Sequence, residues 1–194
     1  MYITAIYGSP RKSGNTDLLL QACVRGMRDA GQSPHELYLR DLQFSPCVEC
    51  GGCSESGRCV IADGMDEVYQ HLLKSDCIVV SAPVFFYGLN ALTKAMVDRL
   101  QCFWVKKYLL HLPVRDTGTV AGCGILLSVG GSRGAKNFDG ILLTMKYFYD
   151  ALDMPFSRSL VYHNIDAQGS ILKHPTALTD AYTLGKTIAE NKTL

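Results

Sequence analysis

Short apolar segments alternate with segments of helical period along almost the whole chain. Strand-like runs occupy residues 2–7, 35–40, 76–82, 119–129 and 156–162. Between them, apolar side chains recur every three or four positions, which predicts helices at 16–30, 64–74, 89–104, 136–152 and 176–191. Strands that alternate with helices pair in parallel and connect through right-handed crossovers. The pattern therefore predicts an α/β protein with a parallel sheet.

Five strands of this kind predict a three-layer α/β/α sandwich. We expect a flavodoxin-like, doubly wound, five-stranded parallel sheet with strand order 2-1-3-4-5. The length suits a single domain spanning residues 1–194. The one irregular insertion is a cysteine-rich loop at residues 41–63, and a loop of that length is often functional.

The composition excludes several classes of protein. The chain has 19 Lys and Arg against 18 Asp and Glu, without the basic excess of a nucleic-acid-binding domain. Hydrophobic residues make up 47% of the chain, enough for a packed core. No apolar run reaches the roughly 20 residues of a membrane helix, and the first residues do not resemble a signal peptide. We expect a cytoplasmic protein with no nucleic-acid or membrane partner.

The loop after the first strand is rich in hydrogen-bond donors. It runs from Gly8 to Thr16, and a helix follows it directly. Hydroxyls, an amide, a guanidinium and free backbone N–H groups at a helix N-terminus suit a phosphate. Neither the Walker A pattern nor G-x-G-x-x-G is present, which leaves a mononucleotide phosphate such as that of FMN. The alternative is an ordinary turn with a helix cap. The candidate phosphate-binding residues are Ser9, Arg11, Ser13, Asn15 and Thr16.

Two further loops follow predicted strands at the same edge of the sheet. One contains three consecutive aromatic residues, whose exposure is unfavourable unless a flat ligand such as an isoalloxazine ring covers them. The alternative is that Phe85 and Phe86 fill the core. The other loop contains glycines that allow a backbone to approach a ring closely. The candidate ring-binding residues are Pro83, Val84, Phe85, Phe86, Tyr87 and Gly88 in the first loop, and Gly130 and Gly131 in the second.

These segments together resemble the NADPH-dependent FMN reductase superfamily. The resemblance rests on Gly-Ser-Pro-Arg-x-x-Gly-Asn-Thr at 8–16, Ala-Pro-Val-Phe-Phe-Tyr-Gly at 82–88, and Lys94-Ala95-x-x-Asp98-Arg99. It covers nearly the whole chain. It implies a flavodoxin-like fold, tightly bound FMN at the residues given above, and a homodimer or homotetramer.

Four cysteines, Cys47, Cys50, Cys53 and Cys59, lie within thirteen residues. Three cysteines at successive gaps of two are typical of ligands to a [4Fe–4S] cluster, with a fourth cysteine further along the chain. Within the superfamily, this spacing resembles that of the iron–sulfur flavoproteins. The alternatives are no metal, a four-thiolate zinc site, and a redox-active thiol or disulfide patch.

The other cysteines, Cys23, Cys77, Cys102 and Cys123, lie among apolar neighbours, and we expect small buried residues there. The histidines show no metal-ligand spacing. No carboxylate pair or nucleophile motif stands out, so we name no side chain as a catalytic acid or base. A flavin would carry the electron chemistry itself.

The expected function is that of an FMN-dependent oxidoreductase of the iron–sulfur flavoprotein type. It would pass electrons between a carrier such as ferredoxin, or NAD(P)H, and a small-molecule acceptor. One alternative is an NAD(P)H-dependent FMN or quinone reductase without a cluster. The others are a non-catalytic, flavodoxin-like electron carrier and a zinc-stabilised interaction domain.

Overall fold

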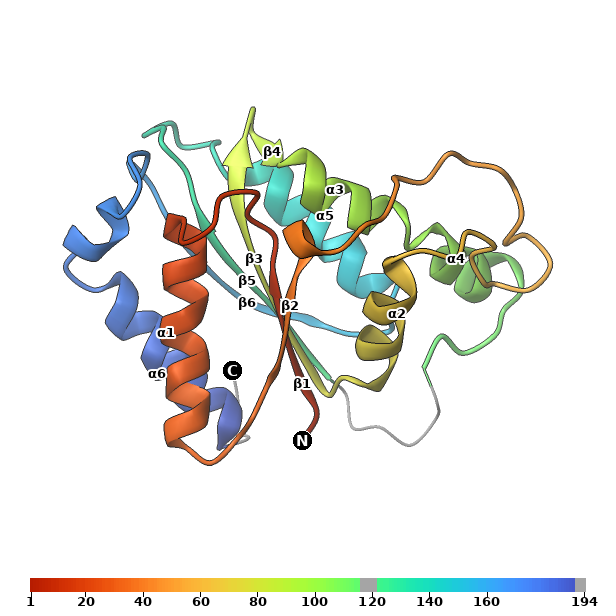
Figure 1. Ribbon diagram of the computed structural model, residues 1–194, viewed down its shortest axis with the longest axis horizontal. Coiled ribbons are helices and arrows are strands. Elements are labelled where there is room, and N and C mark those ends of the chain that lie inside the picture. The colour runs from red at the N-terminus through yellow and green to blue at the C-terminus, as the bar shows by residue number, and fades with distance from the viewer. Residues whose placement is uncertain (116–121, 191–194) are drawn as a thin grey trace.

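A parallel sheet forms the centre of the protein. The computed structural model describes residues 1–115 and 122–190. The parallel strands run in the spatial order β2-β1-β3-β5-β6, which confirms the predicted order 2-1-3-4-5 (Figure 1). Their bounds are β1 (Ile3–Tyr7), β2 (His35–Tyr38), β3 (Cys77–Phe85), β5 (Cys123–Val129) and β6 (Phe156–Tyr162).

Helices cover both faces of the sheet, as expected for three layers (Figure 1). One face carries α1 (Asn15–Asp29) and α6 (Ala177–Ala189). The other carries α2 (Met65–Lys74), α3 (Ala91–Asp98), α4 (Gln101–Trp104) and α5 (Asp139–Asp150). In the part of the chain described, no helix combines the length and apolar character needed to cross a membrane.

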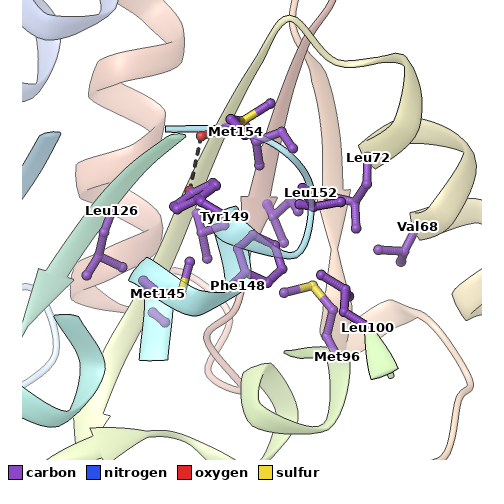
Figure 2. Packing of buried hydrophobic residues seen from close by; sticks show 14 of the residues in the cluster. Val68, Leu72, Met96, Leu100, Leu126, Met145, Phe148, Tyr149, Leu152 and Met154 are labelled. Atoms are coloured by element: carbon purple, nitrogen blue, oxygen red, sulfur yellow. Dashed lines mark hydrogen bonds between the residues drawn. The ribbon is translucent and has the colours of Figure 1, made fainter. Parts of the chain in front are cut away.

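The core is divided into two clusters by the alternation of side chains along the strands. On β3, Ile78 and Val80 face α2, α3 and α5, whereas Cys77 and Val79 face α1 and α6. Figure 2 shows the first cluster, in which side chains of α5 pack against those of α2 and α3. The buried Tyr149 of α5 donates its hydroxyl to the carbonyl of Ile125 at 2.6 Å, which fixes this helix on the sheet.

The segment predicted as one helix at 89–104 is not continuous. The structure divides it into the short strand β4 (Gly88–Leu89), α3 and α4, and continues it as a π-helix, η2 (Val105–Leu109). Asn90 follows β4 and caps α3. Its side chain accepts a hydrogen bond from the N–H of Thr93. The apolar period cannot show such a cap or the break at Arg99 and Leu100.

The sequence predicted that this strand ends at residue 82, before Pro83. In the structure β3 continues to Phe85. Strand β1 pairs with β3 only as far as Ser81, so the next residues of β3 have a free edge on that side. A proline, which has no N–H to donate, is tolerated at such an edge. On the other side Pro83 remains in register with Val129 of β5.

The remaining boundaries differ by a few residues. The strand predicted at 35–40 ends at Tyr38, where the 3-10 helix η1 (Leu39–Asp41) begins. The strand predicted at 119–129 begins at Cys123, and residues 119–121 lie outside the described residues. The last predicted helix ends at Ala189, and its predicted final residue, 191, also lies outside them.

Two cysteines expected to be simple core residues are paired instead. Cys77 and Cys123 lie opposite each other in the parallel register of β3 and β5 and are joined by a disulfide, with Cα atoms 4.6 Å apart. Nothing in their local sequence indicates the pairing, because only the sheet register brings them together. Cys23 and Cys102 are free and buried, as expected.

Candidate functional site

The loops that contain the candidate ligand-binding residues meet at the carboxyl edge of the sheet (Figure 1). Gly8, at the end of β1, donates its N–H to the carbonyl of Ser81 at 2.7 Å. Its own carbonyl accepts the side chains of Asn90 at 2.7 Å and Thr93 at 2.9 Å. A Cβ at Gly8 would lie 2.3 Å from the Thr93 hydroxyl oxygen, so this close contact between Gly8 and α3 requires glycine.

The loop from Ser9 to Gly14 has the form of an anion cradle. Ser9 accepts the N–H of Arg11 on its side-chain oxygen at 3.1 Å, while Arg11 and Ser13 are exposed. Ser13 adopts a positive φ of 54°, which turns the chain into α1. Gly14 precedes the helix and supplies no side-chain cap. The first N–H groups of α1 are therefore open to an anion at the helix N-terminus.

Asn15 has a different set of contacts from the other loop residues. Its side chain donates to the carbonyl of Ala167 at 2.9 Å and accepts the N–H of Ile171 at 3.2 Å. These bonds connect the first loop to the segment after β6 and occupy the amide. Thr16 and Ser9 are 2% and 3% exposed, so among the proposed phosphate residues Arg11 and Ser13 have exposed side chains near the helix N-terminus.

Two residues that sequence reasoning missed support this loop from below. The carboxylate of Asp17 is buried, accepts the N–H of Ser13 at 3.0 Å and pairs with Arg40 at 3.0 Å. Arg40 also donates to the carbonyl of Ser9 at 3.3 Å. Burial raises the pKa of Asp17, and the contacts with Arg40 and Ser13 only partly oppose it. The sequence signal that could have identified Asp17 is its position as an acidic residue in the first turn of a helix.

The second loop is a tight hairpin that extends beyond the sheet. Phe86 and Tyr87 form its turn with φ values of 49° and 64°, and β4 pairs antiparallel with Val84 and Phe85. Two consecutive positive φ values define a type I′ turn, which bulky aromatic residues rarely adopt. Phe85, Phe86 and Tyr87 are 51%, 104% and 56% exposed, so they do not fill the core. They form an exposed aromatic surface, and the Tyr87 hydroxyl lies close to Gly134 of the third loop.

The third loop is tied to the end of β6. Gly130 donates to the carbonyl of Tyr162 at 3.0 Å and accepts the N–H of Ile165 at 3.1 Å. A Cβ at Gly130 would lie 2.1 Å from the side-chain nitrogen of Asn137, so packing within the protein already requires glycine here. Gly131 is exposed and is the glycine of this pair that is accessible to a ligand.

The cysteine loop forms a separate site, held by one buried arginine. Arg99, at the end of α3, is 1% exposed. Its Nη1 donates to the carbonyl of Ser45 at 2.9 Å and to Asp63 at 2.7 Å. Its Nη2 donates to the carbonyl of Ile61 and to Asp63, both at 3.1 Å. Arg99 therefore fixes both ends of the loop, although it stands far from them in the sequence.

Asp63 completes this anchor and lies just before α2. Its carboxylate accepts the N–H groups of Met65 at 3.0 Å and Ser45 at 3.2 Å. Burial alone would raise the pKa of Asp63, but the hydrogen bonds from Arg99, Met65 and Ser45 outweigh burial and hold the pKa below its usual value. Asp63 is therefore ionised at neutral pH and remains paired with Arg99.

All four cysteines of the loop line one cavity of about 270 Å³. Cys50 is exposed, and the other three are partly buried. The rest of the wall includes Arg99 and residues of α4 and η2: Gln101, Cys102, Val105 and Leu109. The loop packs closely on η2, because a Cβ at Gly57 would lie 2.7 Å from that of Lys106. A π-helical turn of this kind is frequent at functional sites.

The cavity is suited to an iron–sulfur group by its donors, although its thiols are not arranged around a single ion. Within residues 1–115 and 122–190, no three His, Cys, Asp or Glu side chains form a group able to hold a metal ion. A polynuclear cluster is larger than one ion and is bound by thiolates spread around it. Cys102 also lines the wall, but burial raises the pKa of its thiol to about 11.

These features define a doubly wound α/β protein with candidate ligand-binding loops at the carboxyl edge of its sheet and a separate cavity lined by thiols. Residues 1–161 match the family described as NADPH-dependent FMN reductase. The chain belongs to this family, as its motifs indicated.

Several curated relatives are named iron-sulfur flavoproteins. An iron-sulfur flavoprotein of Methanosarcina thermophila is 35% identical over 133 residues, which are 69% of this chain and 65% of the relative. An iron-sulfur flavoprotein of Methanocaldococcus jannaschii is 35% identical over 99 residues, or 51% of each chain. The matched regions thus span half to just under two thirds of these relatives.

Solved structures confirm the fold. An NAD(P)H:quinone oxidoreductase from Methanothermobacter marburgensis superposes with a TM-score of 0.68 and 16% identity, covering 97% of this chain and 96% of the other. A sequence identity this low supports a shared fold and nothing further.

Proposed function

We propose that the protein is an FMN-dependent oxidoreductase of the iron–sulfur flavoprotein type. It would pass electrons between ferredoxin or NAD(P)H and a small-molecule acceptor. The observation that carries this proposal is that one cavity is lined by all four loop cysteines, Cys47, Cys50, Cys53 and Cys59, in a chain of the FMN reductase family. Those four thiolates would hold a [4Fe–4S] cluster. The flavin supplies two-electron chemistry, and the cluster supplies one-electron steps.

The FMN site is proposed for the carboxyl edge of the sheet. Ser9, Arg11, Ser13 and the N-terminal amides of α1 would hold the phosphate, with Asn15 and Thr16 shaping the loop around it. The ring would lie against the hairpin of Pro83, Val84, Phe85, Phe86, Tyr87 and Gly88, with Gly130 and Gly131 on the third loop opposite. The exposure of the three aromatic side chains supports this assignment.

We further propose that the protein acts as a homodimer or homotetramer in the cytoplasm. Large apolar side chains remain exposed on the layer of α4, η2 and α5, including Trp104, Leu109, Leu143 and Tyr147, at 41–61%. Such a group is unfavourable in water unless a second surface covers it.

The cluster assignment is tested by replacing the most exposed thiol of the loop. Cys50→Ala should lose most of the iron bound by the anaerobically prepared protein while FMN remains bound. Cys23→Ala is the matched control, because Cys23 is buried in α1 on the other side of the sheet and should leave the iron content unchanged. Full iron content in Cys50→Ala would show that the ligand set is wrong.

A second candidate function is that of an FMN or quinone reductase that uses NAD(P)H and carries no cluster. The family's description, which names NADPH and FMN, favours it. It predicts FMN-dependent oxidation of NAD(P)H that is unaffected by Cys50→Ala.

A further inference from the structure

The guanidinium of Arg99 has one donor left over after it has anchored the cysteine loop. An arginine carries five N–H groups in a fixed planar fork. Four of them are used by the carbonyls of Ser45 and Ile61 and by both oxygens of Asp63. The fifth, on Nε, is buried and has no partner among the described residues.

A buried donor without an acceptor is rare in folded proteins and calls for an explanation. Arg99 also forms part of the wall of the neighbouring cavity, together with the four loop cysteines. Among the lining residues, all of which lie in the described part of the chain, Arg99 is the one cation. The wall thus combines the thiols of the loop with one guanidinium, whose Nε has no partner among the described residues.

We propose that Nε of Arg99 donates a hydrogen bond to a sulfur atom of the iron–sulfur group that these cysteines hold. The acceptor is a cysteine thiolate or an inorganic sulfide, both of which carry negative charge. This inference rests on the proposed function, since it requires the group to be present. It gives Arg99 two roles, one through its terminal nitrogens in shaping the loop and one through Nε in stabilising the bound group.

The second role has an electrostatic consequence. One-electron reduction, by ferredoxin or by NAD(P)H through the flavin, adds a negative charge to the group. A hydrogen-bond donor on a guanidinium favours the more negative state, and hydrogen bonds to sulfur are a known determinant of cluster potential. Arg99 therefore raises the reduction potential above that of the same cluster without the donor.

The experiment uses unmutated protein purified without oxygen from cells supplied with arginine labelled with ¹⁵N at Nε. After reduction, pulsed electron paramagnetic resonance should detect a weak ¹⁵N coupling to the cluster spin. Arg58→Lys is the matched control, because Arg58 lies beside Cys59 in the loop but is exposed. The coupling should persist in Arg58→Lys and vanish in Arg99→Lys, whose cluster should also show a lower midpoint potential.

The outcomes separate this inference from the proposed function. A normal cluster signal without ¹⁵N coupling in the unmutated protein overturns the role of Arg99 and leaves the cluster assignment intact. A coupling that disappears in Arg58→Lys also overturns it. Protein with FMN but without iron overturns both proposals. Because the first readout needs no substitution, loss of folding in Arg99→Lys does not remove the test.

Discussion

The side chain of Asn15 joins two loops that lie 152 residues apart in the sequence. From the sequence, its amide is an obvious phosphate ligand, since it follows a glycine at the start of a helix. In the structure both ends of the amide contact the backbone between Ala167 and Ile171. Its first contribution is therefore to the position of the loops, before any ligand binds.

This role predicts a loss of stability in Asn15→Ala even without FMN. The N–H of Ile171 would remain buried without an acceptor, at a free-energy cost of about 1–3 kcal/mol. Urea unfolding of the apoprotein measures the change, with Lys173→Ala, at an exposed residue of the same segment, as the control. If apo Asn15→Ala unfolds at the same urea concentration as the unmutated protein, the amide acts on the ligand alone.

The residues that the sequence did and did not reveal differ in a physical way. The cysteine spacing is local, so the sequence alone identified the thiols that share the cavity. Arg99 anchors carbonyls up to 54 residues away, and its partners are visible only once the chain has folded. The same holds for the pair of Asp17 and Arg40 beneath the first loop.

At the scale of elements, helices α1 and α6 pack closely against each other. A Cβ at Gly26 would lie 2.1 Å from the carbonyl oxygen of Tyr182, and one at Gly185 would lie 2.0 Å from that of Cys23. The two glycines therefore allow the helix backbones to approach each other. The sequence period predicted both helices, but it could not show that they touch.

We expect Gly185→Ala to destabilise the protein, although alanine favours a helix. The added methyl group would force the helices apart, with a loss of about 1–3 kcal/mol in the free energy of unfolding. Lys186→Ala on the exposed side of α6 should change it by less than about 0.5 kcal/mol. Equal stability of Gly185→Ala and the unmutated protein in thermal unfolding would mean that the helices are less tightly packed than the structure shows.

The aromatic hairpin shows where element prediction fails at a candidate site. Strong strand propensity and Pro83 suggested a loop after residue 82, whereas the chain continues as a strand and reverses at Phe86 and Tyr87. Positive φ values at bulky residues are stored strain, which clusters at ligand-binding sites. Local propensity opposes this turn, so it could not be read from the sequence.

At the scale of the whole molecule, the strand order was predictable because alternating strands and helices permit few parallel arrangements.

The amino edge of the sheet carries an aromatic cluster that the sequence did not indicate. The hydroxyl of Tyr2 forms a hydrogen bond with Nδ1 of His71 at 2.7 Å, and the Tyr2 ring stacks on the His35 ring with their centres 4.6 Å apart. Burial, with a smaller contribution from His35, lowers the pKa of His71.

This lowered pKa predicts that stability falls in mildly acidic solution. The unfolded chain takes up a proton at His71 near its ordinary pKa of about 6.5, whereas the folded protein does so only at lower pH. The contribution of His71 to stability is therefore present above about pH 6.5 and is lost as the pH falls through the folded-state pKa. His71→Gln should show a smaller loss between about pH 7.5 and about pH 5.5 in urea unfolding. Identical pH profiles for His71→Gln and the unmutated protein would show that His71 is not the cause of the lost stability.

The most direct test of the account is the content of iron, acid-labile sulfide and FMN per chain in protein purified without oxygen. We predict about four irons and about four sulfides beside one FMN. FMN without iron or sulfide would contradict the iron–sulfur assignment and leave the simpler flavin reductase as the function of this chain.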